Sequence, residues 1–151
     1  MTHVDMDRVA ELLGGQNVLR HRLSGPMDAH ALLLTGLPGT ALTHLLDNLQ
    51  VLDRSASAVQ QAVGMSLRTF QRRKDSPAKA LSQEQSGRTW KFAEVLARAT
   101  EVFGSQHEAE LWLERPAIGL DQCSPIALLA TQAGVDIVET FLQRLEHGVY
   151  A

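Results

Sequence analysis

The sequence predicts an all-α protein, and three features of the chain support that fold class. Alanine and leucine are abundant, while aromatic residues make up only 5% of the 151 residues, and this composition favours helix over strand. Apolar residues recur at intervals of three and four along most of the chain, as they do on the buried face of a helix. No segment alternates apolar and polar residues with the two-residue period of a half-buried strand.

Glycine and proline residues divide the N-terminal part into short helices. We expect the first helix over residues 5–13, ended by Gly14-Gly15. Asp28 is expected to cap a helix over residues 29–34, and Pro38 to lie in the first turn of the next one. That next helix carries a leucine stripe that offers apolar surface for the core or for a dimer, namely Leu42, Leu45, Leu46 and Leu49.

Residues 56–75 predict a helix-turn-helix. In this motif two short helices meet at a sharp angle, with apolar residues between them and a glycine in the turn. Gly64 fits the turn, and the apolar set is Val59, Val63, Met65 and Phe70. Gln60 departs from the motif, because alanine usually stands there and lets the second helix cross closely. The alternative interpretation is an ordinary helical hairpin with a solvated basic face.

Positive charge is concentrated on the second helix of this motif. The chain has a net charge of -3, yet residues 66–79 carry five Lys/Arg and one Asp. Arg68 and Arg72 lie four residues apart and share a helix face, where their guanidinium groups can take phosphates or guanine edges. Ser66, at the helix start, can offer its hydroxyl and N–H groups to a phosphate. The predicted DNA-binding residues are Ser66, Arg68, Thr69, Gln71, Arg72, Arg73 and Lys74.

Residues 81–151 predict a second helical part, which carries ten Asp/Glu against five Lys/Arg. We place the domain boundary at residue 80, within a short connector. Ser82 and Gln85 form a capping box that opens the longest helix, which runs to Phe103. Three further helices are expected over residues 105–115, 124–130 and 135–146, with Gly134 as the break before the last one.

The residues give no support to an enzyme, a cofactor or a metal site. The six histidines include no pair at the three- or four-residue spacing of helical metal ligands. No nucleophile stands with a base and an orienting partner. We expect an acidic, solvated face from Glu108, Glu110 and Glu114.

The chain also lacks the signals of an exported or membrane protein. Its single cysteine, Cys123, excludes an intrachain disulfide and fits a reducing compartment; we expect it in the core. The first five residues lack the basic-then-apolar order of a signal peptide, and no stretch approaches the roughly 20 apolar residues of a membrane span. We therefore expect a cytoplasmic protein with no membrane partner.

Taken in order, several segments resemble the Xre/MbcA/ParS antitoxin family. They are Met65–Arg73, Leu81–Ser86, Val102–Gly104, Trp112-Leu113, Pro116, Ser124–Thr131 and Glu146–Ala151, preceded by Leu12–Gly15 and Gly36–Pro38. The resemblance covers most of the chain and rests on order and spacing rather than on one short motif. It implies a type II antitoxin. In this family an Xre-like N-terminal part binds the operon's own promoter, and a C-terminal part binds a toxin, usually a RES-domain enzyme that consumes NAD or uses it for ADP-ribosylation.

The resemblance further implies that the C-terminal end blocks the toxin's active site. Mapped onto this chain, the toxin-binding residues are Arg144, His147, Gly148, Val149, Tyr150 and Ala151. Gly148 lets the chain leave the helix in a left-handed turn, Tyr150 offers a ring that can stack, and the Ala151 carboxylate can pair with an arginine. The chemistry alone leaves a second interpretation open, in which Val149 and Tyr150 fold back as a hydrophobic helix cap.

Two function hypotheses from different classes follow. In the first, residues 1–80 bind DNA and dimerise, residues 81–151 bind and neutralise a RES-domain toxin, and the protein represses its own operon. A homodimer is expected because a lone helix-turn-helix rarely reads enough DNA for specificity. In the second, the chain is a dimeric transcription regulator whose C-terminal part serves only dimerisation or ligand sensing. A neighbouring gene for a RES-domain protein would discriminate between them.

Overall fold

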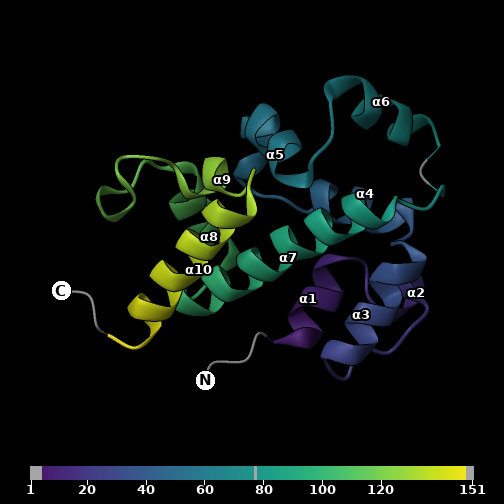
Figure 1. Ribbon diagram of the computed structural model, residues 1–151, viewed down its shortest axis with the longest axis horizontal. Coiled ribbons are helices and arrows are strands. Elements are labelled where there is room, and N and C mark those ends of the chain that lie inside the picture. The colour runs from purple at the N-terminus through teal and green to yellow at the C-terminus, as the bar shows by residue number, and fades with distance from the viewer. Residues whose placement is uncertain (1–4, 77, 149–151) are drawn as a thin grey trace.

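The computed structural model is helical throughout the residues that it describes, 5–76 and 78–148 (Figure 1). The N-terminal part contains α1 (Met6–Leu12), α2 (Gln16–Leu19), α3 (Pro26–Thr35), α4 (Gly39–Asp47), the 3-10 helix η1 (Leu52–Ser55), α5 (Ala56–Val63) and α6 (Leu67–Asp75). The C-terminal part contains α7 (Gln83–Phe103), α8 (Gln106–Glu114), η2 (Ile118–Leu120), α9 (Pro125–Leu128) and α10 (Gln132–Glu146). No strand occurs in these residues, so the predicted all-α class is confirmed.

The 21-residue helix α7 is the element around which the others pack (Figure 1). The predicted capping box starts it: the Ser82 hydroxyl accepts from the Gln85 N–H, and the Gln85 side chain accepts from the Ser82 N–H. Small residues keep its neighbours close, because Ala93, Ala97 and Ala99 are fully buried. α7 contacts α1, α3 and α5 from the N-terminal part and α8 and α10 from the C-terminal part. It therefore joins the two parts into one body.

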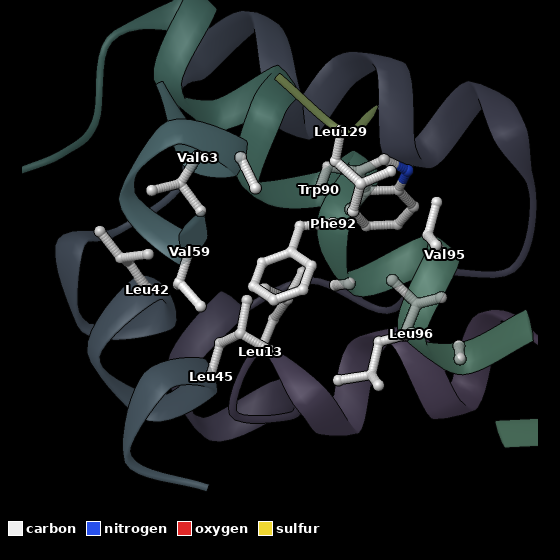
Figure 2. Close-up of a cluster of buried hydrophobic side chains, with 14 of the residues drawn as sticks. Leu13, Leu42, Leu45, Val59, Val63, Trp90, Phe92, Val95, Leu96 and Leu129 are labelled. Carbon is white, nitrogen blue, oxygen red and sulfur yellow. The ribbon is translucent and has the colours of Figure 1, made fainter. Parts of the chain in front are cut away.

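One continuous hydrophobic cluster runs from Val9 to Leu142. Figure 2 shows its centre, where Phe92 of α7 lies among Leu13, Leu45 and Val59. The predicted leucine stripe belongs to this core, since Leu42, Leu45 and Leu49 are buried and Leu46 is half-buried. The stripe is thus a packing surface within the chain.

Two helix starts, those of α3 and α4, differ from the prediction. Helix α3 begins at Pro26 rather than residue 29, so Asp28 lies in its first turn and is not the cap. Its carboxylate instead accepts from the Ser24 hydroxyl at 2.6 Å and the Ser24 N–H at 2.9 Å, which lowers the pKa of Asp28. Pro38 is the N-cap of α4 and precedes its first turn.

Gly134 does not break the chain between α9 and α10, contrary to the prediction. It lies in the first turn of α10, where its N–H donates to the capping hydroxyl of Thr131. A Cβ at this position would overlap the Leu128 carbonyl. Glycine is therefore needed for the close approach of α9 to α10. The sequence-based prediction instead attributes this glycine to a helix break.

The prediction for Cys123 is also wrong. It is expected in the core, but it is exposed in the loop before α9.

The expected acidic face on α8 is wrong for two of its three residues. Glu110 is fully buried, and its carboxylate accepts from the N–H groups of Gln50, Val51 and Leu52 at 2.8–2.9 Å. Only Glu108 is exposed. Because these partners are backbone groups about sixty residues away, the local sequence around Glu110 carries no sign of them. The carboxylate fixes α8 to the start of η1, the segment that leads into the helix-turn-helix.

Glu114, one turn further along α8, reinforces the same junction. It accepts from the Arg54 guanidinium through both oxygens, at 2.6 and 2.8 Å, and from the Ser55 hydroxyl at 3.1 Å. The Arg54 hydrogen bonds lower the pKa of the Glu114 carboxyl. The acidic residues of α8 are therefore anchors for residues 50–55.

We predict that Glu110→Ala lowers the free energy of unfolding by at least about 3 kcal/mol, since the buried N–H groups of Val51 and Leu52 and the part-buried N–H of Gln50 lose a partner worth ~1–3 kcal/mol each. Glu108→Ala, on the exposed side of the same helix, is the matched control and should cost at most about 1 kcal/mol. Urea unfolding followed by circular dichroism measures both. Equal midpoints for the two variants would contradict the anchoring role of Glu110.

Candidate DNA-binding and toxin-binding surfaces

Helices α5 and α6 form the helix-turn-helix that the sequence predicts. Gly64 makes the turn in the left-handed region (φ 74°), which glycine adopts without strain. Ser66 then caps α6, its hydroxyl accepting from the Thr69 N–H at 3.2 Å. The predicted apolar residues Val59, Val63 and Met65 are buried and Phe70 is half-buried. Gln60, the departure from the motif, is half-buried beside them.

The basic face of α6 is open. Arg68, Gln71 and Arg72 are exposed, and none of their side chains has a hydrogen bond or ion pair with the described residues. Thr69 is half-buried, and its hydroxyl is bonded to that of Ser66. The side chain of Lys74 is not among those that the structure describes. α6 stands at one end of the molecule, on its outer edge (Figure 1).

The candidate toxin-binding residues begin in the last turn of α10, which lies at the other end of the molecule (Figure 1). Arg144 and His147 are exposed in and just after the last turn of α10, and Gly148 adopts the predicted left-handed turn (φ 66°). The remaining three, Val149, Tyr150 and Ala151, lie outside the described residues.

Aromatic packing holds α10 in place. The ring of Trp112 on α8 lies 5.8 Å from that of Phe141 on α10 and 5.2 Å from that of Phe103 on α7. Ion pairs support the same contact, because Glu139 of α10 meets both Lys91 and Arg98 of α7 at 3.5 Å. The last helix is thereby fixed relative to the core.

Comparisons with known proteins match both surfaces. Residues 28–94 match the Antitoxin Xre-like helix-turn-helix domain, and residues 98–148 match the Antitoxin Xre/MbcA/ParS C-terminal toxin-binding domain. The chain is 30% identical to an Antitoxin Xre of Photorhabdus laumondii over 128 residues, which are 83% of this chain and 82% of the relative. The chain belongs to the Xre/MbcA/ParS antitoxin family.

Two further relatives support this assignment. An Antitoxin Xre of Yersinia enterocolitica is 30% identical over 130 residues, which are 77% of this chain and 87% of the relative. An Antitoxin Xre of Pseudomonas putida is 29% identical over 128 residues, 83% of this chain and 76% of the relative. Both matched domains include part of α7, which agrees with its packing against both parts. The division into 1–80 and 81–151 stays a prediction.

Two features are absent from the residues that the structure describes. They contain no group of three metal-ligating side chains, and none of their helices is long and apolar enough to span a bilayer.

Arg73 occupies a different place from the other basic residues of this antitoxin's α6. Its guanidinium donates to the carbonyls of Lys79 and Ala80 at 3.0 Å and to the side chain of Gln85 at 2.9 Å. It therefore ties the end of α6 to the start of α7. Helix periodicity places Arg73 on a different side of α6 from Arg72. The sequence does not show that the carbonyls of Lys79 and Ala80 lie on that side.

Arg88 of α7 positions the helix-turn-helix, and sequence reasoning missed it. Its guanidinium donates to the carbonyls of Gln61 and Ala62, at 2.6 and 3.2 Å, and to that of Ala130 at 3.0 Å. The first two carbonyls belong to the last turn of α5, where helix carbonyls need outside partners and attract positive charge. One side chain thus joins the helix-turn-helix, α7 and the loop after α9.

We predict that Arg73→Ala destabilises the antitoxin by roughly 1–2 kcal/mol, because three charge-assisted hydrogen bonds are lost at a partly exposed site. Arg72→Ala removes the same side chain one position earlier and should change stability by less than about 0.5 kcal/mol. Urea unfolding of the two variants measures the difference. If Arg72→Ala proved the more destabilising, the distinction between anchor and open face would be wrong.

Proposed function

We propose that this antitoxin neutralises a RES-domain, NAD-consuming toxin and represses its own operon by binding promoter DNA. The observation that carries the proposal is the placement of two exposed surfaces at opposite ends of one core (Figure 1). The α6 face lies at one end and the last turn of α10 at the other. Ligands at these surfaces do not compete for the same residues.

For the toxin, the proposal assigns residues 144–151 as the element that blocks the active site. The exposed Arg144 and His147 support this assignment because their side chains are accessible to a partner. The left-handed conformation of Gly148 supports it because this conformation ends the helical path of α10. The match of residues 98–148 to a toxin-binding domain supports the kind of partner. That the partner is a RES-domain enzyme rests on the resemblance of the sequence.

For DNA, the proposal assigns the face made by Arg68, Gln71 and Arg72. Arginine forks bind phosphates and guanine edges, and a glutamine between them can pair with adenine. Ser66 and Thr69 at the start of α6 are placed for phosphate contacts through the helix N-terminus. We propose a homodimer, because two copies would bring two such helices to successive half-sites.

Removal of residues 149–151 tests the toxin half of the proposal. We expect the truncated antitoxin to form a complex with the RES-domain protein but to leave its NAD consumption active, because the blocking element is gone while the docking surface remains. The truncation removes the stacking ring of Tyr150 and the carboxylate pairing of Ala151, and each loss weakens the blocked complex by on the order of 1–3 kcal/mol. Coexpression with growth and NAD readouts, together with pull-down, measures inhibition and binding separately.

Full neutralisation by the truncated chain would assign inhibition to another surface. The matched control is the full-length antitoxin at the same expression level. If the full-length antitoxin neither binds nor inhibits a RES-domain protein, the assignment of a RES-domain toxin as the partner is wrong.

Arg72→Ala tests the DNA half. If Arg72 reads a base, affinity for the upstream region of the gene should fall by roughly 1–3 kcal/mol; if it contacts phosphate, affinity should fall across all sequences and the salt slope should drop by about 1. Arg144→Ala is the matched control, since it removes the same charge at the opposite end and should leave DNA affinity unchanged. Fluorescence anisotropy over a salt series measures both. Absence of binding by the wild type at low salt would eliminate the proposed autoregulation.

A further inference from the structure

Two large apolar side chains are exposed in the C-terminal part of the described residues. Ile118, in η2, is 85% exposed and is the most exposed large apolar residue described. Ile137, on α10, is 49% exposed. Solvent exposure of an isoleucine offers no gain to the free protein, and neighbouring exposed apolar residues commonly mark an interaction surface.

Backbone hydrogen bonds hold Ile118 outward. The loop around η2 is closed by bonds from the Ala117 N–H to the Cys123 carbonyl at 3.0 Å and from the Gln122 N–H to the Ala117 carbonyl at 2.9 Å. Leu120, two residues after Ile118, is buried and anchors the loop. Ile118 is therefore presented on a defined support, so that a partner meets a surface already formed.

A groove of about 280 Å³ runs between this loop and α10. Gly119 and Leu120 form one wall, and Ile137 and Phe141 contribute to the other. Asp136 lies toward one end of the helical wall and Arg144 toward the other, eight residues or roughly 12 Å apart along the helix. The groove thus has an apolar floor with a negative and a positive end.

The groove is continuous with the surface assigned to the toxin. Arg144 lines it and also begins the blocking element, and the whole groove lies within residues 98–148, which match a toxin-binding domain. The loop that carries η2 and the last turn of α10 lie on the same side of the molecule (Figure 1). The α6 face is at the other end, so this groove is open to a toxin while DNA is bound.

We propose that the toxin docks in the groove between η2 and α10, and this inference rests on the proposed function. The partner segment that fits is an apolar side chain inserted between Leu120 and Ile137, with an acidic group on the Arg144 side and a basic or amide group toward Asp136. Docking here provides affinity, while inhibition depends on the blocking element of the proposed function. Binding and inhibition then depend on adjacent but separate parts of the antitoxin.

The test compares apolar-to-charged substitutions at exposed sites only. Ile137→Asp alters the helical wall of the groove, and Ile118→Asp alters the exposed residue of η2 that precedes the opposite wall. Met27→Asp and Leu34→Asp alter exposed residues of α3, which are 76% and 56% exposed, and serve as matched controls. The probe is the RES-domain protein encoded beside the antitoxin gene, and its affinity is measured by titration calorimetry. Thermal melting confirms that each variant is folded.

We expect Ile137→Asp to weaken toxin binding at least tenfold and the double variant with Ile118→Asp at least a hundredfold, with the α3 variants within twofold of wild type. If the wild type binds the toxin and the groove variants bind it equally well, this inference is overturned and the proposed function stays intact. Lost self-association with unchanged toxin binding would also overturn it, because the groove would then join two copies. Failure of the wild-type antitoxin to bind would overturn both the inference and the toxin assignment.

Discussion

The buried carboxylate of Glu110 is the contact on which the arrangement of this antitoxin depends. It lies on α8, within the segment that matches the toxin-binding domain. Its oxygens nevertheless accept hydrogen bonds from the backbone N–H groups of residues 50–52, just before the helix-turn-helix. Arg88 makes the complementary contact from α7, donating to the carbonyls that end α5. Separating the two parts would leave buried donors and acceptors unpaired, which is costly in a low-dielectric interior. The helix-turn-helix is thus held at both its start and its turn by residues of the C-terminal part.

A shared core gives the two surfaces a fixed geometry. α7 runs between them, with its start bonded to Arg73 of α6 and its end packed under Trp112 and α10. The α6 face and the η2–α10 groove consequently lie at opposite ends of one shared core, and a toxin in the groove need not displace DNA. In this account the antitoxin binds toxin and DNA at the same time, and neither ligand displaces the other.

The sequence predicted what local signals determine. Gly64 with Ser66 defined the helix-turn-helix, Ser82 with Gln85 defined the start of α7, and the arginine spacing placed Arg68 and Arg72 on an open face, because caps, turns and helix periodicity are encoded within a few residues. The errors concern contacts across the chain. The sequence predicts a solvated Glu110, because the backbone groups that it binds lie about sixty residues away. It predicts a helix break at Gly134, although the reason for glycine there is the close Leu128 carbonyl of α9. Within the candidate sites, the orientation of Arg73 and the η2–α10 groove depend on tertiary packing and had no local signal.

Hydrogen exchange of the full-length antitoxin, measured alone, with the RES-domain protein and with promoter DNA, tests the central claim of two separate surfaces on one body. The account predicts that the toxin slows exchange in residues 117–123 and 136–148, that DNA slows it in residues 66–75, and that both footprints persist in the ternary mixture. A toxin footprint over residues 66–75, or loss of the DNA footprint when toxin is added, would contradict it.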